Sequence, residues 1–322
     1  MELAFQFLIL IGGLLLILWG ANWLVDGSSS IARKTGLSEF VIGLTIVGIG
    51  TSAPEMVVSF ISAFEGKASM AIGNVIGSNI FNVMMILGIT ALISPMIITK
   101  DNLKRDLPLN LGVTLLLIIM GLKHTLFGVG SDAISRLDGA IMLFIFALYL
   151  YKSFKTGTSA PDSDNDEEIK TFTTGRSIFM IICGLGGLIV GGRAFVHSAT
   201  AIATTLHLSE KFIAITIMAA GTSLPELATC VVAARKGRGQ LALGNIIGSN
   251  ISNVLLILGG ASLIHPLSFD GISTVDICAL LFTAIFLIVS AYTFSKGKLD
   301  KKEGLILLIV ESLYMVWLFL NA

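Results

Sequence analysis

Charged residues are scarce in this chain of 322 residues. Asp, Glu, Lys and Arg together make up 13% of the sequence, hydrophobic residues make up 54%, and the mean hydropathy is +0.90. Soluble domains carry about 25% charged and about 45–50% apolar residues. The composition therefore excludes an ordinary soluble domain and favours a membrane protein. We expect the lipid bilayer as a partner, no nucleic acid and no obligate protein partner.

Cysteine and histidine are also few, and they do not gather. The three cysteines fall inside predicted membrane spans at no metal-like spacing, and the four histidines lie near predicted span ends. Such cysteines usually serve as small apolar packing residues. The sequence has no HExxH motif and no Ser–His constellation. We therefore expect neither a cysteine–histidine metal centre, nor a prosthetic group, nor an enzyme.

Long apolar stretches recur instead, each of about 20 residues, which is enough to cross the roughly 30 Å hydrocarbon core as a helix. They predict an all-α integral membrane protein with about ten transmembrane helices. The expected spans are 4–26, 38–64, 69–94, 107–123, 137–152, 177–195, 210–234, 240–265, 275–294 and 304–321. The first lacks a small-x-small cleavage site, so we interpret it as a span and not as a signal peptide.

Basic residues predict the orientation of these helices. With the N-terminus outside, the loops expected inside hold 16 of the 21 Lys and Arg residues. Because positively charged loops stay in the cytoplasm, we expect both termini outside. Residues 153–176 are rich in Ser, Thr, Asp, Glu and Gly and predict a flexible cytoplasmic linker. Their acidic run does not fit an EF-hand calcium loop, because the sixth position from Asp162 is Glu167 and not glycine.

Two polar motifs each occur twice. Residues 50–55 read GTSAPE and residues 221–226 read GTSLPE, while residues 73–82 read GNVIGSNIFN and residues 244–253 read GNIIGSNISN. The offset is 171 residues for both motifs. A duplicated acidic motif in a membrane-type sequence marks a functional site, because a carboxylate is costly to bury there.

Corresponding motifs lie five predicted spans apart, and five is odd. The second copy therefore crosses the membrane in the opposite sense. This predicts two inverted-topology five-helix repeats, residues 1–152 and 177–322, joined by the linker 153–176. Many secondary transporters follow this plan, with the substrate site near the bilayer midplane between the repeats.

The first motif places a small residue, a threonine, a serine and a glutamate on one helical face, at spacings i, i+3, i+4 and i+7. The two copies of this face are Gly48, Thr51, Ser52, Glu55 and Ala219, Thr222, Ser223, Glu226. The proline before each glutamate removes a backbone donor and frees or bends nearby carbonyls. The second motif spaces asparagine, serine and asparagine at i, i+4 and i+8. Its copies are Asn74, Ser78, Asn82 and Asn245, Ser249, Asn253.

The ligands that these motifs offer are all oxygens, from carboxylates, amides, hydroxyls and loosened carbonyls. Hard cations such as calcium prefer this set. Two glutamates bring a charge of −2, which one Ca²⁺ balances. Two facing carboxylates are costly in a low dielectric when empty. Some cation, or protons, should therefore always be bound. A site that is never empty must take up one ion when it releases another, which favours exchange over leak.

These paired motifs resemble the α-repeats of the calcium/cation antiporter superfamily, and especially its sodium/calcium exchanger branch of prokaryotic type. The resemblance covers nearly the whole chain, including the span number, the inverted halves and the central linker. It implies that Glu55 and Glu226 are the central calcium ligands, with backbone carbonyls from Thr51 and Thr222. It further implies a central place for two amides and flanking sodium sites with nearby carbonyls. These residues are Asn82 and Asn253 for the amides, and Ser52, Ser78, Ser223, Ser249, Gly48 and Ala219 for the sodium sites.

One position departs from part of that superfamily. Some relatives carry Asp where this chain has Asn253, whereas here both central amides are Asn, which favours a two-carboxylate centre and no potassium dependence. Asn79 and Asn250 lie one residue off the ligand stripe, and helix-packing hydrogen bonds and ion contact both stay open for them. Glu311 has no acidic counterpart in the first repeat, and we expect a structural or interfacial role for it.

The resemblance implies exchange of about three Na⁺ for one Ca²⁺ by alternating access, with the first and sixth spans sliding past a fixed core. We therefore expect a Na⁺/Ca²⁺ antiporter of a prokaryotic plasma membrane, with Ca²⁺ and Na⁺ as its transported ions. Ca²⁺/H⁺ exchange by the same two glutamates stays open, because carboxylates bind both ions, although the hydroxyl-rich flanks favour sodium. A cation channel is more remote, because channels usually place their ligands around a symmetric pore.

Overall fold

The structure is a computed structural model of the chain, and it describes all residues except 1, 157–170, 207–220, 294–296 and 322. In the described part, six helices are long and apolar enough to cross a membrane, or seven when one bent pair counts as a single span. These helices confirm the all-α membrane fold that the hydropathy predicts.

Of the six long helices in the described residues, four are single uninterrupted α-helices. The uninterrupted ones are α1 (Glu2–Thr35), α9 (Arg136–Thr156), α10 (Thr174–Thr205) and α17 (Lys301–Asn321). Two more change from α- to π-helix and back. They are α5 (Ala68–Phe81), η2 (Asn82–Leu87), α6 (Gly88–Ile93), and α14 (Gly239–Ser252), η5 (Asn253–Leu258), α15 (Gly259–Ile264).

The second span is the bent one, and the remaining helices are shorter. The bent span comprises α2 (Glu39–Ile42), η1 (Gly43–Val47), α3 (Gly48–Thr51) and α4 (Ala53–Phe64). The shorter elements are η3 (Asn102–Asp106), α7 (Leu107–Gly121), α8 (Lys123–Phe127), α13 (Leu224–Arg235) and α16 (Thr274–Ser290). Every predicted span thus contains a helix, and the first part of the predicted span 210–234 lies outside the described residues.

The first and sixth spans run well past their predicted ends at residues 26 and 195. Helix α1 continues to Thr35 and α10 to Thr205. Polar residues end the hydropathy signal there, but some of them are buried between the two helices. Ser177 Oγ donates to Ser30 Oγ at 2.9 Å, and both serines have no exposed surface. This pairing offsets the cost of burying Ser30 and supports the extension of α1. The hydroxyls of Ser28, Ser29 and Ser198 are buried in the two extensions without a hydrogen-bond partner among the described residues.

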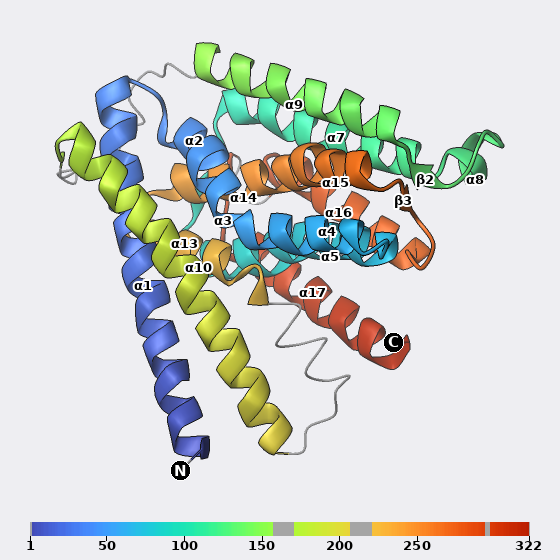
Figure 1. Cartoon of the computed structure of the whole chain (residues 1–322). Coiled ribbons are helices and arrows are strands. Elements are labelled where there is room, and N and C mark those ends of the chain that lie inside the picture. The colour runs from blue at the N-terminus through green and yellow to red at the C-terminus, as the bar shows by residue number, and fades with distance from the viewer. Residues whose placement is uncertain (1, 157–170, 207–220, 294–296, 322) are drawn as a thin grey trace.

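Helices α1 and α10 lie side by side and cross the stack of the other helices at a steep angle (Figure 1). Small residues line their contact. A Cβ atom added to Gly20 would lie 2.6 Å from the Gly184 carbonyl oxygen, and one added to Gly191 would lie 2.8 Å from that of Gly13. Only glycine permits this backbone-to-backbone approach. The two long helices therefore pack as one unit.

A second close approach joins the repeats at the duplicated motifs. Helix α14 packs against α2, η1 and α3. A Cβ atom added to Gly48 would lie 3.0 Å from the Asn245 carbonyl oxygen, and one added to Gly248 would strike the Leu44 carbonyl oxygen. These glycines bring the GTSAPE segment of one repeat against the GNIIGSN segment of the other.

Two short antiparallel strand pairs also connect the repeats. Strand β1 (Met96–Ile97) pairs with β4 (Lys298–Leu299), and β2 (Ala133–Ile134) pairs with β3 (Leu267–Ser268). Each pair joins a loop of the first repeat to a loop of the second. Helix α7 runs between β1 and β2, so the two pairs lie at opposite ends of that crossing.

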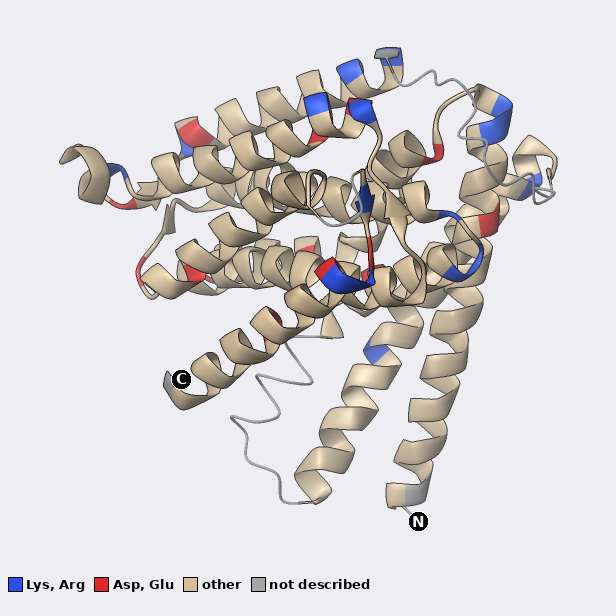
Figure 2. Ribbon diagram, turned by 180° about the vertical axis from the view of Figure 1, so that it is seen from behind, with Lys and Arg blue, Asp and Glu red and all other residues tan. Residues whose placement is uncertain are grey.

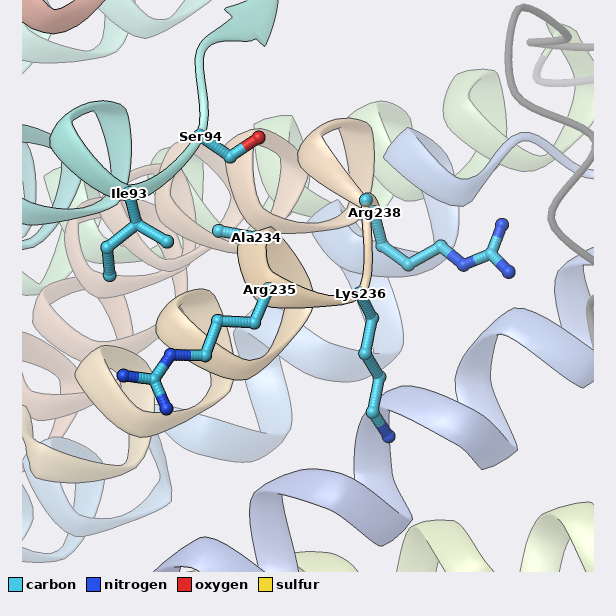
Figure 3. A pocket seen from close by; sticks show the side chains of 7 residues that line it. Ile93, Ser94, Ala234, Arg235, Lys236 and Arg238 are labelled. Atoms are coloured by element: carbon cyan, nitrogen blue, oxygen red, sulfur yellow. The ribbon is translucent and has the colours of Figure 1, made fainter.

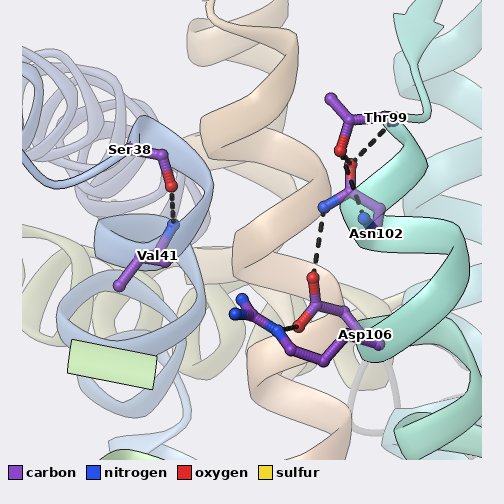
Figure 4. Close-up of polar contacts among 6 residues, drawn as sticks. Ser38, Val41, Thr99, Asn102 and Asp106 are labelled. Carbon is purple, nitrogen blue, oxygen red and sulfur yellow. Dashed lines mark hydrogen bonds and ion pairs between the residues drawn. The ribbon is translucent and has the colours of Figure 1, made fainter. Parts of the chain in front are cut away.

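Side-chain hydrogen bonds begin the helices near one of these ends (Figure 4). Ser38 Oγ accepts from the Val41 backbone N–H at 3.2 Å and caps α2. The Thr99 backbone N–H donates to Asn102 Oδ1 at 2.9 Å, and Arg105 Nε lies 2.9 Å from the buried Asp106. The bonds from the Val41 and Thr99 N–H groups satisfy backbone donors at the helix starts, whereas the Arg105–Asp106 pair joins two side chains.

Most charged residues lie near helix ends and in loops, away from the middle of the helices (Figure 2). Glu55, Glu226 and Glu311 are exceptions, because they lie within spans and are at most 1% exposed. The first two belong to the duplicated motif. Glu311 lies on α17 with one carboxylate oxygen that has no hydrogen-bond partner in the described part of the chain.

Candidate cation-binding site

The glutamates of both GTS-x-PE motifs lie at the start of a half-helix. Helix α3 ends at Thr51 and α4 begins at Ala53, with a 47° bend between the two halves of the span. Pro54 is in the first turn of α4, where its missing N–H has no partner to lose. Proline thus starts a new helix here, and the bend comes before it. Helix α13 begins the same way in the second repeat, with its proline and glutamate in the first turn.

Hydrogen bonds cross between the repeats at these glutamates. Ser52 Oγ donates to Glu226 Oε1 at 3.0 Å, and Ser223 Oγ donates to Glu55 Oε1 at 3.2 Å. All four side chains are at most 1% exposed. The serines therefore hold one oxygen of each carboxylate and leave the second oxygen free.

The central amides form a second crossing network. Asn82 Nδ2 donates to Asn250 Oδ1 at 3.0 Å, and Asn253 Nδ2 donates to Asn79 Oδ1 at 2.9 Å. The π-helical segments η2 and η5 begin at Asn82 and Asn253. Such segments are frequent at functional sites. They change the helical period at the residue that carries the amide.

Four buried oxygens at this place have no hydrogen-bond partner among the described residues. They are Oε2 of Glu55, Oε2 of Glu226, Oδ1 of Asn82 and Oδ1 of Asn253. Helix α4, which carries Glu55, packs against η5, and α13, which carries Glu226, packs against η2. Leaving a buried oxygen unpaired costs about 1–3 kcal/mol, and more for a charged group. Four such oxygens, on two pairs of residues at equivalent repeat positions, are the kind of ligand that a hard cation prefers.

The other predicted ligands fall into three groups. Thr51 Oγ1 donates to Asn245 Oδ1 at 3.1 Å, so its hydroxyl hydrogen bonds to the opposite repeat. Ser249 Oγ donates to the Gly48 carbonyl oxygen at 3.1 Å, so these two predicted sodium ligands are in contact. Ser78 is buried on α5 and Thr222 is half-buried beside Ser223. Ala219 lies outside the described residues.

Sequence reasoning left the role of two residues open, and their contacts now describe it. Asn79 and Asn250 bond across the repeats to each other's backbone and to the central amides. The sequence also indicated no contact for Asn74. In the structure, Asn74 Nδ2 donates to the Glu55 backbone carbonyl oxygen at 3.3 Å. The sequence signal for Asn79 and Asn250 was their repetition in both GSN segments. That repetition does not show which groups they bond to.

A cavity of about 490 Å³ lies elsewhere, at the turn between α13 and α14 (Figure 3). Its lining includes Arg235, Lys236 and Arg238, and their side chains point away from one another. A basic lining does not suit a cation. In the described residues, no three His, Cys, Asp or Glu side chains gather as a metal cluster. Of the two places, the paired carboxylates and amides are thus the better candidate for a cation site.

An oxygen-lined site between two inverted repeats of membrane helices defines a secondary cation transporter. The family model for "Sodium/calcium exchanger protein" matches residues 5–155 and 176–320. The chain belongs to the sodium/calcium exchanger family, whose members are exchangers of calcium and other cations and not enzymes.

Individual relatives agree with this placement. The chain is 37% identical to the "Putative antiporter CaxA" of Alkalimonas amylolytica, over 95% of this chain and 96% of that protein. It is 34% identical to the "Sodium/calcium exchanger MaX1" of Methanosarcina acetivorans, over 98% of each. A solved structure of the sodium-calcium exchanger NCX_Mj, soaked with 2.5 mM Na⁺ and 10 mM Sr²⁺, matches with a TM-score of 0.84 at 32% identity. That match covers 98% of this chain and 99% of the other.

Proposed function

We propose that the protein is an antiporter that exchanges Na⁺ for Ca²⁺ by alternating access, with the ions bound near the midplane between the repeats. The observation that carries the proposal is the set of four buried, unpartnered oxygens on Glu55, Glu226, Asn82 and Asn253. Two of them belong to carboxylates, and a divalent cation balances their charge. Relatives named as sodium/calcium exchangers support the choice of ions.

We assign Ca²⁺ to the two carboxylates, completed by backbone carbonyls of Thr51 and Thr222. The flanking positions suit Na⁺, because they offer hydroxyls and carbonyls without a further charge. The contact between Ser249 Oγ and the Gly48 carbonyl supports one of them. Ser52 and Ser223 link the sodium positions to the carboxylates, since each donates to a glutamate. The second flanking position takes Ser78 together with the carbonyl of Ala219.

The way the long helices pack supports alternating access. Helix α1 packs against α13, whereas α10, its counterpart in the other repeat, makes no contact of that extent with α4 in the described residues. We take the side where α1 meets α13 as the covered side of the site. Because α1 and α10 pack backbone to backbone, they can move as one unit and reverse which side is covered.

An ion pair holds that covered side. Lys236 Nζ lies 2.7 Å from Asp26 Oδ1, which joins the turn after α13 to α1. Both side chains are partly exposed, and such pairs are worth about 0.2–1 kcal/mol. We expect Asp26→Asn or Lys236→Met to ease opening and to raise the initial exchange rate by about two- to fivefold. Initial rates of ion uptake into proteoliposomes measure this.

Two further variants make the result specific. The reversed pair, Asp26→Lys with Lys236→Asp, should return the rate to that of the wild type. Lys67→Met is the matched control, because Lys67 pairs with Glu65 inside one loop and bridges no moving helices. A reversed pair that behaves like the single variants would show that the ion pair does not control opening.

We further propose a plasma-membrane protein with both termini outside, and residues 153–176 as the cytoplasmic linker between the repeats 1–152 and 177–322. The excess of basic residues in the loops on the linker's side supports this orientation. The two matched segments of the family model flank the linker. Single cysteines at Lys34, at the exposed end of α1, and at Lys67, in the exposed turn after α4, test it with an impermeant reagent added from outside. We expect Lys67→Cys to react and Lys34→Cys not to react, and the reverse result would contradict this orientation.

The coupling ion decides between the two exchanger hypotheses. The test is ⁴⁵Ca²⁺ uptake into proteoliposomes loaded with NaCl, with and without an outward sodium gradient at matched pH. We expect uptake only with the sodium gradient, because the hydroxyl-rich flanks suit Na⁺. Indifference to sodium, with uptake driven by an imposed proton gradient, would instead make the protein a Ca²⁺/H⁺ exchanger. Uptake that needs no counter-ion gradient would indicate a channel.

A further inference from the structure

Asn79 and Asn250 occupy equivalent positions on α5 and α14, and their side chains are 2% and 4% exposed. Asn79 Nδ2 donates to the backbone carbonyl oxygen of Asn250 at 3.1 Å. Asn250 Nδ2 donates to the backbone carbonyl oxygen of Asn79 at 3.3 Å. A carbonyl oxygen can only accept a hydrogen bond. The orientation of both side-chain amides is therefore fixed by the backbone.

This fixed orientation passes to the next pair of amides. With Nδ2 on the backbone, Oδ1 of Asn79 faces Asn253 and Oδ1 of Asn250 faces Asn82. Each of these Oδ1 atoms needs a hydrogen-bond donor, and the only donor group on the facing side chain, Asn253 or Asn82, is its Nδ2. Asn253 and Asn82 must therefore turn their own Oδ1 atoms away from this contact. Those are the two amide oxygens that are buried without a partner.

We propose that Asn79 and Asn250 are positioning residues that lock the central amides with their oxygen atoms, and not their NH₂ groups, toward the bound cation. The inference rests on the proposed function of the site. An Asn side chain has nearly the same shape in both orientations, but a flipped amide would direct two donors with partial positive charge at the ion. The lock excludes that orientation and keeps the site selective for cations.

A simple packing role would need only the bonds to the backbone, which already join α5 to α14. The second bond, from each Oδ1 to a central amide, is what a packing role leaves unexplained. The four hydrogen bonds also respect the symmetry of the repeats, because Asn79 acts on Asn253 and Asn250 acts on Asn82. The proposal therefore predicts which residues depend on each other.

A double-mutant cycle on Ca²⁺ binding tests this dependence. Isothermal titration calorimetry of the purified full chain gives the Kd for Ca²⁺ of the wild type, Asn79→Ala, Asn253→Ala and the double variant. Losing the lock should weaken binding about three- to tenfold. If Asn79 acts through Asn253, the double variant should bind no more weakly than Asn253→Ala alone. Multiplying effects would overturn the proposal.

Thr90→Val is the matched control, because Thr90 is buried in the same span as Asn79 and donates to the Ile86 carbonyl oxygen one turn earlier in that span. The factor by which Thr90→Val changes the Kd for Ca²⁺ should multiply with the factor for Asn253→Ala in the double variant. Should Asn79→Ala fail to fold, the equivalent cycle of Asn250→Ala with Asn82→Ala gives the same test. If the wild type binds no Ca²⁺, the proposed function is overturned. If the wild type binds Ca²⁺ but the two substitutions act independently on the Kd, only the lock is overturned.

Discussion

Replacing either central glutamate by glutamine should abolish calcium transport. Glu55 and Glu226 are at most 1% exposed, and each offers one carboxylate oxygen without a partner. Glutamine keeps the shape but removes one of the two charges. A pair of unit charges about 4 Å apart is worth about 4 kcal/mol at an effective dielectric constant of about 20. The loss corresponds to a weakening of Ca²⁺ binding of about 1,000-fold or more.

Initial rates of ⁴⁵Ca²⁺ uptake into proteoliposomes measure the effect, with calorimetry for Ca²⁺ binding. Glu311→Gln is the matched control, because Glu311 is equally buried in a span and also has an unpartnered oxygen, but lies on α17. It should retain most of the transport. Near-normal transport by both Glu55→Gln and Glu226→Gln would show that the site lies elsewhere.

The second large effect is expected from Asn253→Asp. Asn253 donates to Asn79 Oδ1, and a carboxylate cannot donate. Asn79 cannot turn to help, because its own Nδ2 is held by the Asn250 carbonyl oxygen. Two acceptor oxygens would then face each other unless the new carboxyl group takes up a proton. We expect transport to change in its pH dependence and its preference among cations, by about tenfold in the competition between ions.

The measurement is Ca²⁺ uptake over a range of pH, with competing Na⁺ and Sr²⁺. Asn82→Asp should behave in the same way, because Asn82 donates to Asn250 in the equivalent contact. Asn110→Asp is the control for an added charge, since Asn110 is buried on α7, outside the duplicated motifs, and its backbone carbonyl accepts from Thr114 of the same helix. Unchanged pH profiles and unchanged competition in both central variants would remove these amides from the site.

Much of this protein follows from the sequence alone. The apolar stretches predict the helical membrane fold, because a bilayer permits few other structures. The two motif copies lie five predicted spans apart, which predicts the inverted repeats, and the duplicated glutamates indicate the candidate site before any fold is known. Apolar stretches and duplicated motifs can be recognised along the chain without knowledge of which residues pack together. Hydropathy ended α1 and α10 too early. For α1 one reason is that hydropathy does not count a hydroxyl group such as that of Ser30, which has its partner on α10.

The tertiary structure decided how the identified residues act on each other. Ser52 holds Glu226 and Ser223 holds Glu55, so each carboxylate is oriented by the opposite repeat. Asn79 and Asn250 received a role only from contacts across 171 residues of chain. A sequence motif records which groups are present, but the direction of a hydrogen bond depends on which acceptor lies opposite. That partner comes from a distant segment, and only the packed helices bring it into place.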